Sequence, residues 1–161
     1  MAREINVAEL NSRVVRSGKE FNTVLEQLIE AAAQEGAKVV RSAGIDLYTE
    51  LVESCPKDTG RAAAGFNIRK ESSEWTPAPK DFTEKKAGQA KAAAETLKNT
   101  AKANALPLFS PMTISNNVEY LIPLENGSSP QKPGGFIALS IRNAMAKLTA
   151  RLNKLSGKKY G

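Results

Sequence analysis

The sequence predicts an α+β protein in which a long N-terminal helix and a C-terminal helix pack on a small antiparallel sheet, with a peripheral Ala-rich helix beside it. Two long stretches, one towards each end, repeat apolar residues at helical spacing, and two short stretches between them have strand character. Of the 161 residues, 41% are hydrophobic and 25% charged, which is typical of one globular domain. We therefore expect a single domain over 1–161, with an N-terminal arm at 1–17, a loop and helical insert at 71–103 and a basic tail at 156–161.

A helix is expected over 18–54, because its apolar residues stay on one face for roughly nine turns. Glycines at 36 and 44 each cost about 1 kcal/mol relative to alanine inside a helix, so they mark either close packing against a neighbour or a slight bend. Pro56 ends the helix, since proline has no N–H and disfavours helical geometry in the residue before it. The apolar face consists of Phe21, Val24, Leu25, Leu28, Ile29, Ala32, Val39, Val40, Ala43, Leu47 and Leu51.

The segment after this helix predicts a tight turn followed by a strand. Between Lys57 and Gly60, the carboxylate of Asp58 can accept hydrogen bonds from the amides just ahead of it, and the glycine can adopt positive φ. The range 61–70 is then expected to be a strand. Its alternation is weak, because three consecutive alanines have little strand preference.

The middle of the chain predicts a loop and a helix with little hold on a core. Prolines and paired serines between residues 71 and 82 indicate a loop, or a segment that a partner orders. That loop contains Trp75, the only tryptophan, which we interpret as a candidate interface residue. Residues 83–103 are rich in Ala, Lys and Glu and favour a helix. Because Leu97 is its one large apolar residue, this helix is expected to be peripheral, with a flexible extension as the alternative.

A second strand and a short helix follow. Residues 106–115 have strand character, and their two prolines indicate either an edge strand or an irregular lead-in. Asn116 and Asn117 form a turn, since asparagine tolerates left-handed backbone. Gly127 ends the single helical turn that comes next, and residues 128–135 are expected to be a loop that becomes ordered on assembly. The side chains predicted to line that turn are Val118, Tyr120, Leu121 and Leu124.

The C-terminal helix is expected from residue 136 to about 155. Its predicted buried stripe consists of Phe136, Leu139, Ile141, Met145, Leu148 and Leu152.

Charge and residue counts narrow the chemistry. The chain has no histidine, which removes the commonest general base and all His-containing metal sites. Its single cysteine, Cys55, can form no internal disulfide and is interpreted as a buried residue at a helix end rather than a reactive thiol. The sequence offers no convincing acid–base pair and no phosphate-binding loop, so we expect no catalytic residue, no metal and no cofactor. No apolar run approaches the ~18 residues of a membrane span.

Two stretches together resemble a known family. CPKDTGRAAAGF resembles the PxDTGxxxxxF segment of the neck and tail-completion proteins of tailed bacteriophages, the family of the minor tail protein Z of phage lambda. ISNNVEYLIPLENGSSPQKPGGFIALSI resembles that family's second motif, and the Ala-rich helix at 86–103 occupies the place of a helical insert. The resemblance covers residues 20–150 in order. It departs from the family at Lys57, at Glu119-Tyr120-Leu121 and in the Trp75 loop.

The resemblance implies a structural role for the motif residues and a place in the virion. The protein would form a closed ring of six subunits in the neck, made in the cytoplasm of a bacterial host. It would lie between head-closure or connector proteins and tail terminator or tail tube proteins, around DNA that passes without sequence-specific binding. Glu125 would also contact a neighbouring subunit or loop. The motif residues are Pro56, Asp58, Thr59, Gly60, Arg61, Asn116, Asn117, Tyr120, Glu125, Gly127, Pro133 and Gly135.

Two other functions remain open from the sequence. A net charge of +6 and the lysine-rich segment 154–159 are compatible with a basic nucleic-acid-binding module. A small enzyme is the third hypothesis, and the absence of histidine argues against it. Salt-dependent DNA binding would separate the first alternative from a connector.

Overall fold

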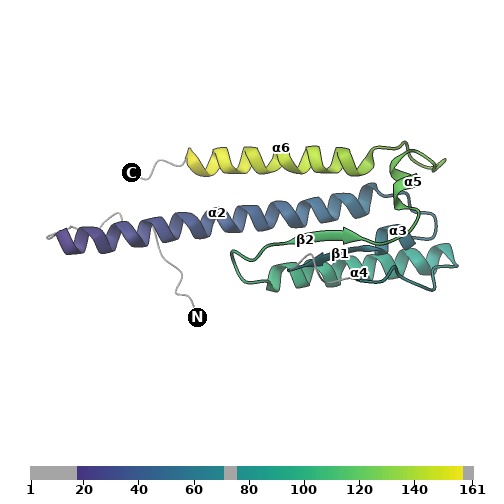
Figure 1. Cartoon of the computed structure of the whole chain (residues 1–161), viewed down its shortest axis with the longest axis horizontal. Coiled ribbons are helices and arrows are strands. Elements are labelled where there is room, and N and C mark those ends of the chain that lie inside the picture. The colour runs from purple at the N-terminus through teal and green to yellow at the C-terminus, as the bar shows by residue number, and fades with distance from the viewer. Residues whose placement is uncertain (1–17, 71–75, 158–161) are drawn as a thin grey trace.

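The computed structural model describes residues 18–70 and 76–157 and is an α+β fold with three layers (Figure 1). Helix α6 forms one outer layer, helix α2 the middle layer, and the two-stranded sheet with α4 the other outer layer. The predicted arm at 1–17, Trp75 and residues 158–161 of the tail lie outside the described residues. In chain order the elements are α2 (Gly18–Ser54), α3 (Arg61–Ala64), β1 (Phe66–Arg69), α4 (Lys85–Ala105), β2 (Thr113–Asn116), α5 (Leu121–Glu125) and α6 (Phe136–Ser156).

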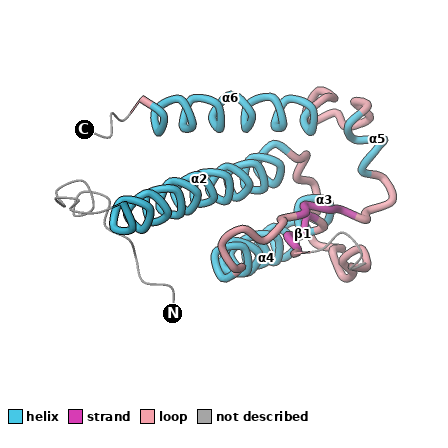
Figure 2. Tube along the Cα trace, turned by 60° about the vertical axis from the view of Figure 1, so that its left-hand side comes forward, coloured by secondary structure: helices cyan, strands magenta, loops and turns pink. Residues whose placement is uncertain are grey.

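Both long helices predicted from apolar periodicity are confirmed, and they pack antiparallel along each other. Polar pairs fix their register: Glu50 on α2 accepts hydrogen bonds from Asn143 at 2.6 Å and from Lys147 at 3.0 Å on α6. One and two turns further on, the Arg151 guanidinium lies 2.6 Å from the Asp46 carboxylate and donates to the Ser42 hydroxyl. Helix α6 therefore packs chiefly on α2, which separates it from the sheet (Figures 1 and 2).

The predicted buried stripe of α6 is confirmed at Phe136 and is wrong further along the helix, because small residues face α2 there instead. The buried side chains of α6 are Phe136, Ser140 and Ala144, spaced four residues apart. A serine and an alanine let the two backbones approach closely, so the larger apolar residues of α6 point elsewhere. The exposed ones are Leu139, Ile141, Met145 and Leu152.

The predicted strand over 61–70 is half wrong. Residues 61–64 form the helical turn α3, and only Phe66–Arg69 form a strand. Alanine prefers helix to strand, and Gly60 with φ of +81° turns the chain into α3. At the other end of α3, a Cβ on Gly65 would collide with the side chain of Asn116, so this position requires a residue without a side chain.

Helix α4 is confirmed. Its alanines and the side-chain amide of Asn99, rather than Leu97, pack against the rest of the fold. Leu97 is 74% exposed, whereas Gly88, Ala92, Asn99 and Ala103 form the buried face. The Asn99 side chain accepts a hydrogen bond from the Ile68 amide at 3.2 Å and donates to the Phe66 carbonyl at 3.4 Å. Helix α4 thereby pairs with the edge of β1 that β2 leaves open.

The sheet consists of β1 and β2, paired antiparallel with Ile68 opposite Ile114. Residues 106–112 are irregular, as one of the two sequence alternatives predicted, and β2 begins only at Thr113. The side chain of Met112 packs against Gly44, where a Cβ would collide with its terminal methyl. The end of the Met112 side chain therefore occupies the space that a Cβ at residue 44 would need, which favours close packing over a bend as the reason for this glycine.

One hydrophobic core joins α2, α3, β1 and α4, and Phe136 and Leu121 close its end. Its largest fully buried side chains are Tyr48 and Ile68. Cys55 is fully buried there, which confirms the predicted buried residue at the end of α2, and burial raises the pKa of its thiol to about 11. None of the described helices is both long and apolar enough to cross a membrane.

Candidate functional site

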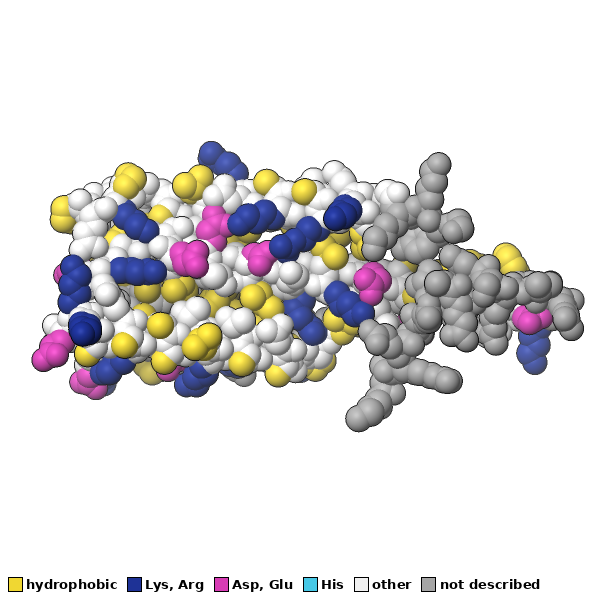
Figure 3. All heavy atoms as spheres, turned by 180° about the vertical axis from the view of Figure 1, so that it is seen from behind, with side chains coloured by type: hydrophobic (Ala, Val, Ile, Leu, Met, Phe, Trp, Pro, Cys, Tyr) yellow, Lys and Arg dark blue, Asp and Glu magenta, His cyan; other side chains and the backbone are white. Residues whose placement is uncertain are grey.

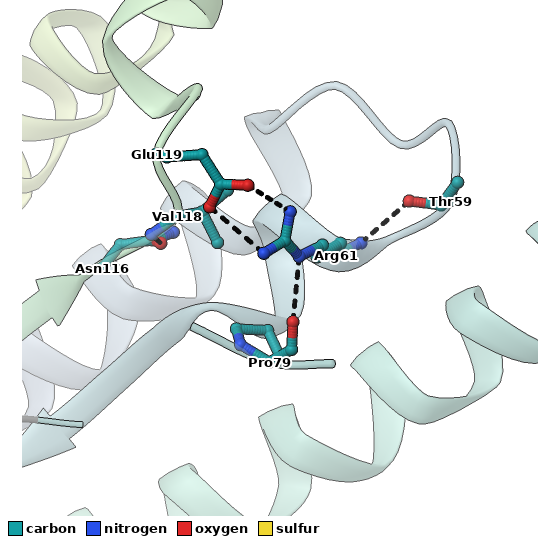
Figure 4. A network of polar contacts seen from close by, with 6 residues as sticks. All are labelled: Thr59, Arg61, Pro79, Asn116, Val118 and Glu119. Carbon is teal, nitrogen blue, oxygen red and sulfur yellow. Dashed lines mark hydrogen bonds and ion pairs between the residues drawn. The ribbon is translucent and has the colours of Figure 1, made fainter. Parts of the chain in front are cut away.

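The first sequence motif and the first half of the second meet in one corner of the molecule (Figure 4). Arg61, the first residue of α3, reaches across to Glu119 with two guanidinium nitrogens, at 2.6 and 3.1 Å from the two carboxylate oxygens. Its Nε donates to the Pro79 carbonyl at 2.9 Å. The hydrogen bond from Arg61 holds the pKa of Glu119 below its usual value, and the same bond raises the pKa of Arg61. One arginine thus ties three chain segments together.

Asn116 locks the same corner through its side-chain amide. The Nδ2 atom donates to the Ala62 carbonyl at 2.8 Å, and Oδ1 accepts from the Val118 amide at 3.0 Å. Asn117 donates to the Thr76 carbonyl at 2.6 Å. The Asn-Asn pair therefore joins the end of β2 to α3 and to the loop before α4. Asn116 is itself the last residue of β2 and neither asparagine has positive φ, so the turn predicted at this pair falls after it, at residues 119–120.

The turn before α3 is confirmed, but Asp58 does not stabilise it as predicted. Gly60 has the expected positive φ, and the Thr59 hydroxyl accepts a weak hydrogen bond from the Arg61 amide at 3.4 Å. Among the described residues the Asp58 carboxylate contacts only Lys85 of α4, at 3.8 Å, and both side chains are largely exposed. Pro56 is buried just beyond the end of α2.

Glu125 stabilises the start of the C-terminal helix from a distance. Its two carboxylate oxygens accept hydrogen bonds from the Ile137 and Ala138 amides, at 2.8 and 3.1 Å, which are free donors of the first turn of α6. Its carbonyl accepts from the Gly135 amide at 2.6 Å. The predicted interface residue Glu125 therefore has an intramolecular role as the N-terminal cap of α6, since Gly135 at the usual cap position has no side chain.

The loop between α5 and α6 is already held in the single subunit, which corrects the expectation that it becomes ordered only on assembly. Lys132 donates to the carbonyls of Glu53 and Ser54 at the C-terminal end of α2, at 2.9 and 3.0 Å. Gly127 and Gly135 both have positive φ, at +88° and +83°, and Pro133 lies between them. Tyr120 packs partly buried against the core, with the Arg61 guanidinium 5.6 Å from its ring.

The polar side chains around Arg61 and around Glu125 form hydrogen bonds within the chain. In the described part of the chain, no three His, Cys, Asp or Glu side chains gather as metal ligands would. The structure thus brings Arg61, Asn116 and Glu119 together in one corner and places Glu125 in a second corner, on the far side of the short helix α5.

Sequence reasoning missed an apolar cleft of about 610 Å³. Helix α2 lines it with Gly36, Ala37 and Val40, and the irregular segment before β2 adds Phe109. Helix α6 contributes Met145, one of the residues that the sequence assigned to its buried stripe. The sequence did indicate extra apolar surface, because α2 and α6 have more apolar residues than one buried face of each helix needs. Periodicity alone, however, does not show which of those residues are buried.

Arg69 was also missed. It is the last residue of β1 and is almost fully buried, yet its Nε and Nη2 atoms have no hydrogen-bond acceptor among the described residues. A buried guanidinium without acceptors is costly.

No protein-family model, curated protein or solved structure matches this chain.

Proposed function

We propose that the protein is a structural subunit of a tailed-bacteriophage virion, which forms a ring in the neck that completes the tail and joins it to the head around the DNA channel. One observation carries the part of this proposal that concerns assembly. Most of the large apolar side chains that the fold leaves exposed lie on the two long helices, including Phe21 and Ile29 on α2 and Leu139 and Met145 on α6. Apolar residues gathered in this way on a soluble subunit mark surfaces that other chains cover.

The resemblance of CPKDTGRAAAGF and of the segment around ISNN and LENG to neck and tail-completion proteins supports the particular place in the virion. The contacts of these motifs support the same idea, because they are structural. Arg61 with Glu119, and Asn116 with Ala62, fix rigid corners between helices. A connector needs such corners to hold its contact surfaces at fixed angles, and the resemblance implies a ring of six.

Mass measurement of the purified protein over a range of concentrations, followed by electron microscopy, tests the proposal. We expect a discrete oligomer of uniform mass that appears as rings with a central channel. A protein that remains monomeric at all concentrations, or that forms open filaments of variable length, would refute the ring. Ring closure requires that a head-to-tail contact return to its first subunit, which filaments fail to do.

The second candidate function is a basic nucleic-acid-binding module. It is favoured by the composition of α6, which contains four Lys or Arg residues and no acidic one. Two of these, Lys147 and Arg151, already pair with Glu50 and Asp46, and Figure 3 shows basic and acidic side chains interspersed on this side of the molecule. A DNA binder would lose affinity steeply between 50 and 200 mM salt, by about 10³-fold or more for six phosphate contacts. We expect only weak DNA binding.

A further inference from the structure

Two apolar surfaces of this subunit, a helix stripe and a cleft, are left open by the described residues. The first is the α2 stripe, formed by Phe21, Leu25 and Ile29, which are spaced four residues apart and all exposed. It lies on the N-terminal turns of α2, which extend beyond the end of α6 (Figures 1 and 2). The second is the cleft, whose floor on α2 contains the small residues Gly36 and Ala37. An apolar helix stripe and an apolar groove are the two halves of a common recognition mode.

The stripe cannot reach the cleft of its own chain. Ile29 of the stripe lies only one turn before Ala33 at the near end of the cleft, but both belong to the same helix, and Leu25 lies roughly 22 Å from Val40 at 1.5 Å per residue. The continuous helix between them, Gly18–Ser54, keeps them at that distance. The cleft of one subunit is therefore available only to the stripe of another.

The charges around the two surfaces are also complementary. Residues 18–35, which carry the stripe, contain four glutamates and one lysine. The helix at 136–156, which forms one side of the cleft, has four basic residues and no acidic one. Lys147 and Arg151 pair with Glu50 and Asp46 of the same chain, which leaves Arg142 and Lys154 for a partner. Arg41 adds a further positive charge to the cleft lining. Opposite charges around an apolar contact favour one orientation and speed the encounter.

We propose that the α2 stripe of one subunit docks in the cleft of the next copy of this chain. This inference rests on the proposed ring and names the contact that builds it. The two halves of the contact are different surfaces, so the contact is head-to-tail and generates a closed ring when its rotation returns to the first subunit. It also explains Gly36, where added side-chain atoms would meet open space inside one subunit. A bare floor at this position lets the helix of a neighbour approach closely.

Aspartate substitutions on each surface test the contact by mass measurement. Ile29→Asp and Met145→Asp alter side chains that are 62% and 56% exposed, so both variants should fold. Each should weaken association by at least about tenfold, since a carboxylate would be buried in an apolar contact. Leu97→Asp is the matched control. Leu97 is exposed on α4, outside both surfaces, and its substitution should leave the oligomer unchanged.

Engineered cysteines test which surfaces meet. Leu25→Cys combined with Met145→Cys should give, on oxidation, a ladder of disulfide-linked oligomers on a non-reducing gel. The two positions are too far apart for a disulfide within one chain, since that bond requires Cα atoms within about 7 Å. The native Cys55 is fully buried and does not compete. Each single-cysteine variant should remain monomeric on the gel, because the contact brings unlike surfaces together.

The outcomes separate this contact from the proposed ring. If both aspartate variants formed rings of wild-type mass, the proposed contact would be overturned. The ring itself would stand, but other surfaces would build it and the cleft would bind something else. Disulfide dimers of Leu25→Cys alone would show a symmetric contact between stripes and also overturn it. A wild-type protein that never oligomerises would refute contact and ring together. Weakened rings with both aspartate variants, together with the disulfide ladder, would establish the contact.

Discussion

Gly88→Ala should destabilise the protein, although the same substitution in a helix usually does the opposite. Alanine is favoured over glycine in a helix interior by about 0.5–1 kcal/mol. At Gly88, however, the new Cβ would collide with the carbonyl oxygen of Thr59 and lie 3.1 Å from the ring of Phe82. The Thr59 carbonyl cannot move away easily, because it belongs to the peptide bond before Gly60. Gly60 is itself packed closely against α4, since a Cβ on Gly60 would lie 2.8 Å from the Gly88 carbonyl oxygen.

The expected magnitude follows from the two opposing effects. Overpacking of this kind costs about 1–3 kcal/mol; with the helix preference subtracted, Gly88→Ala should lose up to about 2.5 kcal/mol. Gly36→Ala is the matched control, since nothing lies within 4 Å of its added Cβ in the single subunit. It should gain about 0.5–1 kcal/mol.

Urea denaturation followed by circular dichroism, with protein dilute enough to be monomeric, measures both changes. The midpoints of the two variants should shift in opposite directions from that of the wild type. If Gly88→Ala were as stable as Gly36→Ala, α4 would not pack against the turn before α3. The corner contacts around Arg61 would then also need to be redrawn, since α3 begins at that turn.

Three further substitutions test the polar locks. Glu125→Ala should lose about 0.5–2 kcal/mol in urea denaturation, because two amides of the first turn of α6 lose their acceptor; unchanged stability would remove its capping role. Asn99→Ala should cost about 1–3 kcal/mol, because the buried Ile68 amide loses its acceptor and the Phe66 carbonyl keeps only the Tyr48 hydroxyl, and a neutral result would mean that water replaces the side-chain amide. Hydrogen bonds from Asn143 and then Lys147 lower the pKa of Glu50. The ionised Glu50 therefore stabilises the fold fully at pH values above its ordinary pKa of about 4.5, and this stabilisation is lost as the pH falls through the lowered pKa. Thermal unfolding between pH 7 and pH 3 should therefore show a shallower acid decline for Glu50→Gln than for the wild type, and identical declines would contradict the pairing.

Elements with long repeats could be predicted from the sequence, and short elements could not. Helix α2 ends where Pro56 places it and is helical from the first described residue, Gly18. Residues 61–64 were assigned to the wrong state because four residues carry too little pattern, and their conformation depends on Gly60 before them and on Asn116 from a distant segment. Contacts between segments far apart in the chain leave no periodic signal.

The candidate site was predicted as a set of residues but not as a set of contacts. Asn116 and Arg61 were both selected, yet nothing in the sequence links Arg61 to Glu119, which stood out only as a departure from the family pattern. Glu125 was selected for a contact with a neighbouring subunit or loop, and its carboxylate caps α6 within the same chain. Hydrogen-bond partners depend on the angles between elements, which the sequence pattern does not report.

The buried face of α6 explains why the subunit has apolar surface to offer to a partner. Ser140 and Ala144 bring α6 close to α2, and hydrogen bonds to Glu50 fix the register of the two helices. Close approach through small residues leaves Met145 and Ile141 on the outside, where they remain 56% and 46% exposed. A chain that only had to fold alone would be more stable with those larger side chains in the helix contact, because buried apolar area stabilises by about 25 cal/mol per Å². In the proposed assembly a neighbouring subunit would cover these side chains.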